Sequence, residues 1–323
     1  MKNSTYSNAL AVASEKYFLG NERINRMTGA TPEEALGILA EVDFGGGVSV
    51  KSPLEFELLI RAEENKLFDF IKEYCTSEAF TEFFITGNDF YNAQAYLRAK
   101  YLKVDPEPML MAEGLIKCAE LKEKILVDEY DGFGKELKEA LLAADRMFVE
   151  HTATGSKTDE LFKSALYKRL YVVSKKDSDL KNLYGLKADE INVSLALRKP
   201  YEEAEKSFVP GGSFDKNELK AISMGTIDIS SVKKNKEKAE TLSLAFRAKE
   251  ENRALSEFEK HSDDLIMEYL LKKKYSSEKI YPFMLYCYYK KRELENVRIV
   301  MVGLLNGMSE ADIKGRLRKS YEW

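Results

Sequence analysis

Residues that build metal centres, disulfide frameworks and tight hairpins are scarce in this sequence. Among 323 residues there are only 3 cysteines, 2 histidines and 7 prolines. The cysteines, Cys75, Cys118 and Cys287, are far apart and form no Cys-x-x-Cys pair, so neither a zinc site nor a disulfide framework is indicated and a reducing compartment fits. No Asn-Gly or Asp-Gly pair separates two alternating strand patterns, which argues against β-hairpins.

The signatures of several functional classes are also missing. The sequence has no Gly-x-Ser-x-Gly, protein-kinase or Rossmann motif, and Gly45-Gly46-Gly47 lacks the Lys-Ser/Thr of a phosphate-binding loop. A formal net charge of −4 does not supply the basic surface of a dedicated nucleic-acid binder. No apolar run approaches 18 residues, and residues 1–6 contain no apolar core of a signal peptide, so we expect neither a transmembrane segment nor a secretion signal.

Helix-favouring residues dominate instead. Lys, Leu, Glu and Ala are abundant, 44% of the residues are apolar, and Thr31-Pro32-Glu33-Glu34 and Ser52-Pro53-Leu54-Glu55 are typical helix starts. We predict an all-α fold. The predicted helices cover residues 6–28, a segment from 31, 52–74, 78–84, a segment from 88 or 89, 108–126, 134–150, 158–174, 187–203, 215–223, about 231–250, 254–274, a segment from 281 to about 305, and a short segment from 309 to 319.

An acid and an asparagine three positions apart recur three times. The pairs are Asp89 with Asn92, Asp189 with Asn192, and Glu293 with Asn296, and successive asparagines are about 100 residues apart. The first two copies lead to Arg98 and Arg198, and the third has Arg298 nearby. Counted from the asparagine, positions −3, 0, +1, +4 and +5 share one face of a helix, so both polar groups lie on the same stripe as core-facing aliphatics.

A buried asparagine without hydrogen bonds costs about 1–3 kcal/mol. We therefore expect each signature asparagine to bond to a neighbouring helix or to a helix end. Two interpretations are open: the signature is a packing device that docks one helix in each repeat, or its polar groups contact a partner.

The copies divide the chain into three blocks. Asp105-Pro106-Glu107-Pro108 and Val209-Pro210-Gly211-Gly212-Ser213 interrupt the helical pattern, because a residue before proline is pushed out of the helical region. We predict three similar helical domains, at residues 1–105, 106–209 and 210–323, with one signature helix in each.

One acidic sequence invites a catalytic interpretation. An Asp-Asp pair in His261-Ser262-Asp263-Asp264 is similar to the paired acidic motifs with which isoprenoid synthases chelate magnesium diphosphate. That chemistry requires a second acidic motif, and Asn88-Asp89 lacks the hydroxyl and glutamate that should follow it. We expect instead a solvated helix start, capped by Ser262 or Asp263.

The third signature resembles a known family. Glu293-Leu294-Glu295-Asn296-Val297-Arg298-Ile299-Val300, with Gly303 and Gly307 after it, is similar to the C-terminal signature of one central-stalk component of the V/A-type rotary ATPases, the one lettered C in this family and d in the eukaryotic enzyme. Further features agree with the resemblance: Tyr6 and Ala9 ahead of a charged helix, the two Asp-x-x-Asn pairs, and Pro210-Gly211-Gly212. The departures are Tyr91 and Ala93, where the family is more aliphatic, and Val302, where the first two copies have arginine.

The resemblance implies an all-helical, funnel-shaped protein of three similar domains around a pseudo-threefold axis, without catalytic residues, cofactor or metal. It implies a place on the cytoplasmic side of the membrane, between the rotor ring of proteolipid subunits and the central shaft. Torque from ATP hydrolysis or from ion flow would pass through it. The alternatives are a generic all-helical adaptor or scaffold and, with little support, a helical enzyme of the isoprenoid class.

Overall fold

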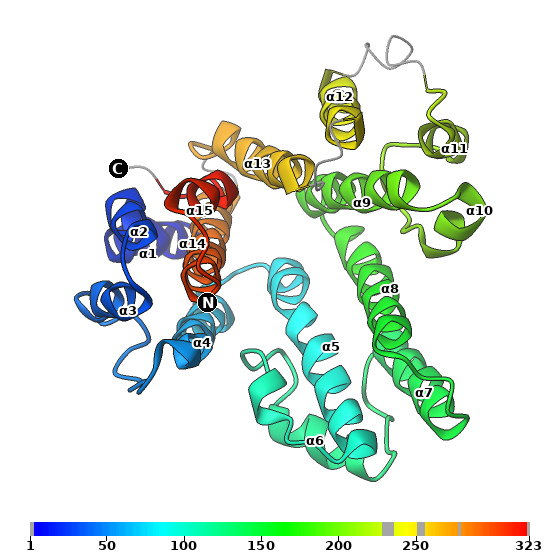
Figure 1. Cartoon of the computed structure of the whole chain (residues 1–323), viewed down its shortest axis with the longest axis horizontal. Coiled ribbons are helices and arrows are strands. Elements are labelled where there is room, and N and C mark those ends of the chain that lie inside the picture. The colour runs from blue at the N-terminus through cyan, green and yellow to red at the C-terminus, as the bar shows by residue number, and fades with distance from the viewer. Residues whose placement is uncertain (1–2, 228–235, 251–255, 277–278, 322–323) are drawn as a thin grey trace. The chain divides into compact units, whose positions relative to one another are not determined.

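The computed structural model describes residues 3–227, 236–250, 256–276 and 279–321. Within these ranges every regular element is a helix and no strand occurs (Figure 1), which confirms the all-α prediction. The chain divides into two compact units. The first unit combines Met1–Glu78 with Glu259–Trp323, and the second is Ala79–Phe258. The first unit thus joins segments from the first and the last predicted repeat, and the repeat boundaries themselves stay a prediction.

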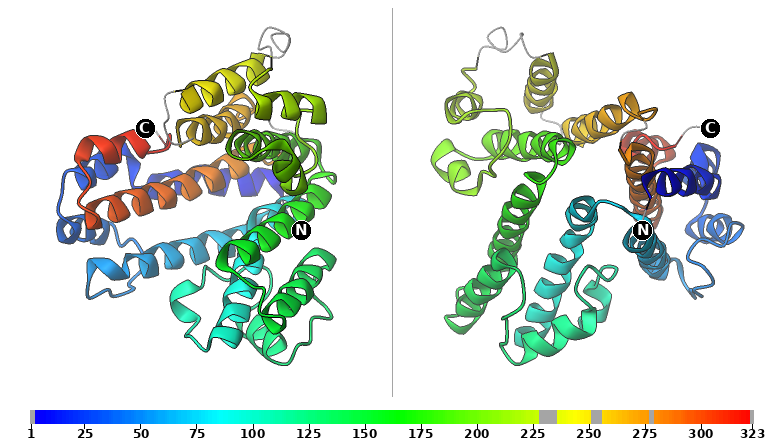
Figure 2. Two further views of the ribbon diagram at one scale, coloured as in Figure 1. Left: turned by 45° about the vertical axis from the view of Figure 1, so that its right-hand side comes forward. Right: turned by 180° about the vertical axis from the view of Figure 1, so that it is seen from behind.

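The first unit is assembled around one long helix, α14. Its helices are α1 (Ser4–Ser14), α2 (Gly20–Thr28), α3 (Pro32–Ala40), α4 (Phe56–Tyr74), most of α13 (Ser256–Lys272), α14 (Tyr281–Leu305) and α15 (Glu310–Arg316), with 3-10 turns at Glu15–Tyr17 and Pro53–Glu55. Figure 2 shows α14 running alongside α4, and α14 also contacts α1, α2, α3 and α15. Val297, Val300 and Met301 of α14 are fully buried in the core of this unit. A helix that is apolar on nearly every side must be covered on nearly every side.

The second unit contains the other two signature helices. Its helices are α5 (Glu78–Leu102), α6 (Cys118–Leu126), α7 (Lys135–Val149), α8 (Gly155–Ser174), α9 (Ser178–Arg198), α10 (Tyr201–Ala204), α11 (Lys216–Met224) and α12 (Lys236–Glu250), with 3-10 turns at Glu107–Met109 and Glu205–Ser207. Phe90 and Leu97 of α5 pack with side chains of α6, α7 and α8. Val193 and Ala196 of α9 pack with side chains of α11 and α12.

Several helix starts follow the expected capping chemistry. Thr31 and Asp215 each form a capping box, in which the side chain accepts from a backbone N–H three residues later and a glutamate there bonds back. Ser309 caps α15. Ser52 caps a 3-10 turn, and α4 begins only at Phe56.

Other predicted boundaries were wrong. The helix expected over 6–28 is interrupted after Ser14 and resumes at Gly20, whose φ of 73° suits glycine. The helix expected over 108–126 is regular only from Cys118, and α9 begins at Ser178 rather than at 187. Of the helices expected from 231 and 254, residues 231–235 and 254–255 lie outside the described ranges.

The largest error concerns α5. Thr86-Gly87-Asn88 resembles a helix end, yet α5 runs unbroken through it. A glycine inside a helix costs about 1 kcal/mol relative to alanine, and the apolar residues that α5 buries on both sides of Gly87, among them Phe80, Ile85 and Phe90, outweigh that cost. Asn88 donates its amide to the carbonyl of Ala112 at 3.0 Å instead of ending the helix.

Candidate functional site

The three signature asparagines are buried and perform the same task. Asn92, Asn192 and Asn296 are no more than 3% exposed, and they lie in α5, α9 and α14. Each uses its carboxamide oxygen to accept a backbone N–H and its NH₂ group to donate to a backbone carbonyl of a non-helical segment. We call each asparagine together with the segment that it holds a clamp. The expectation of a partner on a neighbouring helix was wrong, because the partner is extended backbone.

The hydrogen-bond lengths are nearly the same in the three clamps. Asn92 accepts from Met111 N at 2.8 Å and donates to Ala112 O at 3.2 Å. Asn192 accepts from Val209 N at 2.8 Å and donates to Val209 O at 2.9 Å. Asn296 accepts from Arg318 N at 2.8 Å and donates to Arg318 O at 2.9 Å. A primary amide satisfies both groups of a peptide unit, as a neighbouring strand would do.

The acid of each signature holds a second point. Asp89 Oδ1 accepts from Ile116 N at 2.9 Å. Asp189 Oδ1 accepts from Ser213 N at 2.6 Å and from Phe214 N at 3.3 Å. The carboxylate of Glu293 accepts from Leu19 N. In the first two clamps, therefore, acid and asparagine grip one continuous segment just before the next helix.

A glycine allows the close approach in these two clamps. A Cβ on Gly114 would lie 2.1 Å from Asp89 Oδ1, and a Cβ on Gly212 would lie 2.4 Å from Asp189 Oδ1. Because no carbon can come so near to an oxygen, the glycines at these positions are part of the acid's binding site.

Burial determines the charge state of the second clamp's acid. Burial raises the pKa of Asp189, although hydrogen bonds from Ser213 and Phe214 and the charge of Lys238 oppose the rise. A carboxyl whose pKa is higher in the folded state stabilises the fold below its ordinary pKa, and that contribution is lost as the pH rises through the folded pKa.

The third clamp contains a buried ion cluster that the sequence interpretation missed. Lys290, one turn before Glu293, lies 2.7 Å from Glu293 and 2.8 Å from Glu63 of α4. Glu63 also binds Lys66 at 2.7 Å and accepts from Gly45 N at 3.0 Å. A lysine in the middle of an aromatic and aliphatic helix was the signal available in the sequence, because such a charge is rarely buried without partners.

The two carboxylates respond differently to this environment. Burial raises the pKa of Glu293, and Lys290 and the Leu19 N–H offset only part of the rise. Burial also acts on Glu63, but Lys290 and Lys66 outweigh it and lower its pKa. Glu63 has two lysines whereas Glu293 has one, which accounts for the opposite directions. The pKa of Lys290 is raised because the two carboxylates outweigh its loss of hydration.

The signature arginines do not form a common site. Arg98 donates to Asp159 and to Thr158 at 2.9 Å, near the start of α8. Arg298 binds Glu57 of α4 through two bonds, of 2.7 and 2.9 Å. Arg198 is the last residue of α9 and is exposed.

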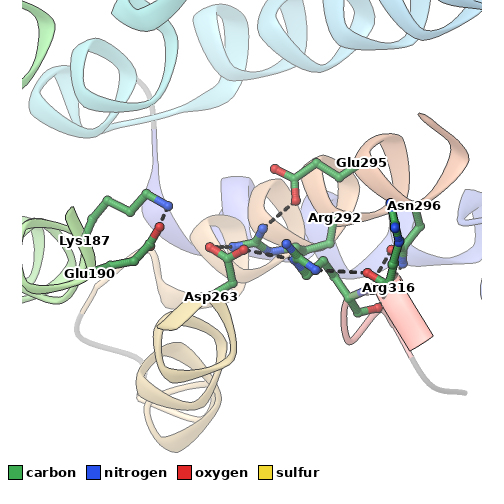
Figure 3. A network of polar contacts seen from close by, with 8 residues as sticks. Lys187, Glu190, Asp263, Arg292, Glu295, Asn296 and Arg316 are labelled. Carbon is green, nitrogen blue, oxygen red and sulfur yellow. Dashed lines mark hydrogen bonds and ion pairs between the residues drawn. The ribbon is translucent and has the colours of Figure 1, made fainter. Parts of the chain in front are cut away.

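The Asp-Asp pair in α13 is not a solvated helix start. Asp263 lies in the middle of α13 and is 8% exposed. Its two oxygens bind Arg292 at 2.8 Å and Arg318 at 3.2 Å, while Arg292 also binds Glu295 (Figure 3). Across the described ranges, no three His, Cys, Asp or Glu side chains are placed to hold a metal ion. Both arginines therefore give Asp263 a role in linking α13, α14 and the segment after α15.

The model of the ATP synthase (C/AC39) subunit family matches residues 7–316. The chain belongs to this family. The match includes all three acid-asparagine pairs, and the family is a structural rather than a catalytic part of the ATPase complex. A search of curated proteins finds no match to the chain. Among the helices that the structure describes, none combines the length and apolar character needed to cross a membrane.

The clamp chemistry predicts opposite results for two isosteric substitutions. Asn192→Asp replaces the NH₂ donor with an oxygen facing Val209 O, and should lower the free energy of unfolding by at least about 2 kcal/mol at pH 7. Asp189→Asn keeps the acceptor and removes a buried charge, and should stay within about 1 kcal/mol of the parent. Relative to the parent, it should gain stability as the pH rises from about 4 to 7. Urea unfolding at several pH values measures both, and equal losses for the two variants would contradict the assignment of donor and acceptor.

The ion cluster gives a second prediction. Lys290→Met leaves two buried carboxylates without their shared partner and should cost about 3–5 kcal/mol at pH 7. The loss should shrink at acidic pH, because both carboxyls would then take up protons. Lys66→Met is the control, since this side chain is 53% exposed and should cost about 1 kcal/mol or less. Similar losses in the two variants, measured by urea unfolding, would show that Lys290 does not hold the cluster.

Proposed function

We propose that this chain is a non-catalytic central-stalk subunit of a V/A-type rotary ATPase. It links the membrane rotor ring of proteolipid subunits to the central shaft, on the cytoplasmic side of the membrane. It transmits torque between ATP hydrolysis or synthesis and ion transport. The observation that carries this proposal is the family match over residues 7–316.

The clamps suit a part that must resist twisting. The signature helices are long, with 25 residues in α5, 21 in α9 and 25 in α14, and at 1.5 Å per residue they extend for roughly 30–40 Å. Each is tied by buried hydrogen bonds to backbone that would otherwise be an unsupported loop. Loops are the compliant parts of most proteins, so the clamps stiffen the path along which torque would pass.

The repeated clamp also supports a threefold architecture. We infer that residues 1–105, 106–209 and 210–323 are three similar domains around a pseudo-threefold axis, arranged as a funnel. An adaptor between a symmetric ring and an asymmetric shaft must present different surfaces to the two. Three copies that share a bonding scheme but differ in their exposed residues meet that need.

The residues that touch partners lie outside the clamps in this proposal. The clamp asparagines are buried and their polar atoms are engaged with backbone. Tyr91 is 54% exposed and Val302 is 43% exposed, and both are positions where the copies differ. We assign the clamps to stability and these exposed side chains to partner contacts.

An assembly experiment tests the coupling role. Purified membrane sector and purified catalytic sector are mixed with or without the chain, and the membranes are sedimented. We expect the catalytic head and shaft to sediment with the membranes only when the chain is present. ATP hydrolysis should then become sensitive to inhibitors of the ring. If the sectors join equally well without the chain, the coupling role is wrong and a generic helical adaptor is the better account.

Tyr91→Ala in the same assay tests the contact assignment. It should lower the fraction of catalytic sector that sediments while leaving the Tm unchanged, because the side chain is mostly exposed. Tyr17→Ala is a matched control, since Tyr17 is 71% exposed but lies outside the signature helices. Equal effects of the two substitutions would remove Tyr91 from the interface.

A further inference from the structure

The five residues after α15 form an extended segment with many partners. We call residues 317–321 the latch. Besides the two bonds between Arg318 and Asn296, its contacts include Arg318 with Asp263 at 3.2 Å, Lys319 with Asp264 and Glu268 at 3.8 Å, Ser320 with Asn21, and Tyr321 with Glu15 at 2.5 Å. The latch therefore touches α13, α14 and the segment between α1 and α2.

The receiving surface is complementary to the latch. It presents carboxylates to the two basic residues and to the tyrosine hydroxyl, and Glu15 and Asp263 among them are 7% and 8% exposed. The Tyr321 ring packs against Phe18 and Tyr289, with ring centroids 5.0 and 5.2 Å apart. Hydrogen bonds to buried carboxylates contribute more than bonds between neutral groups, so this small segment is held specifically.

The third clamp differs from the other two in what it grips. In the first and second clamps, acid and asparagine hold one continuous segment, residues 111–116 and 209–214, with a helix on either side. In the third, Asn296 holds Arg318 whereas Glu293 holds Leu19, about 300 residues away in the chain. Non-covalent contacts, of Ser320 with Asn21 and of Tyr321 with Glu15 and Phe18, join the two gripped segments directly.

From this contrast we propose that the latch is a releasable lock on the N-terminal helices of the first unit. While the latch is seated, Tyr321 and Ser320 keep residues 15–21 against α14. When it lifts, residues 15–21 retain the Glu293 bond to Leu19 but lose these contacts, and α1 and α2 can open locally. The rest of the fold stays in place, because the first and second clamps lie wholly within residues 79–258. The matched family region ends at residue 316, so it does not include the latch.

Limited trypsin digestion of the full-length chain tests the lock. Lys16 and Arg23 flank the gripped Leu19, and cleavage at either requires local opening of the chain. The double variant Ser320→Ala with Tyr321→Phe removes two hydroxyls and adds no bulk. We expect cleavage at Lys16 and Arg23 to become about tenfold faster, while cleavage at Arg146 in α7 stays unchanged.

The control is Lys319→Ala, which removes a side chain that is 62% exposed and lies 3.8 Å from its partners. It should change cleavage at Lys16 and Arg23 by less than twofold. Unchanged cleavage in the double variant would show that the latch does not hold residues 15–21. A parallel increase at Arg146 would show general unfolding instead of local release, and would equally overturn the proposal.

Discussion

The fold depends on the pairing of a buried carboxamide with a single peptide unit. An extended segment inside a helical protein has no neighbouring strand to satisfy its N–H and C=O groups, and leaving them unpaired is costly. A buried asparagine has the complementary problem. Asn192 and Val209 solve both together, at 2.8 and 2.9 Å, and the same solution recurs at Asn92 and Asn296. The long helices can therefore pack closely against irregular backbone.

The acid of the signature shows how one motif adapts to different surroundings. Asp89 and Asp189 reach forward to the segment that their asparagine already holds, and Gly114 and Gly212 leave room for them. The longer Glu293 reaches a distant segment instead and is buried with Lys290. The third copy has thereby become the place where α4, α14 and the residues before α2 meet. Copies with the same asparagine chemistry can thus stabilise different connections.

The sequence carried the repeat but not the partner of each repeat. The spacing of Asp189 and Asn192 placed both on the core side of a helix, because helical periodicity is a local property. Val209 could not be identified, since any backbone N–H and C=O offer the same two groups. The continuity of α5 through Gly87 was missed because tertiary burial outweighed a local preference of about 1 kcal/mol. Asp263 was misplaced for a similar reason, as its arginine partners are distant in sequence.

Amide hydrogen exchange of the intact chain tests the central claim most directly. Met111, Val209 and Arg318 lie outside helices, and each donates its N–H to a signature asparagine. If the clamps hold these segments, their amides should exchange as slowly as those in the middle of α5, α9 and α14. In the corresponding Asn→Asp variants this protection should be lost at the affected clamp first. Exchange of all three amides at the rate of unprotected loops in the parent chain would contradict the account.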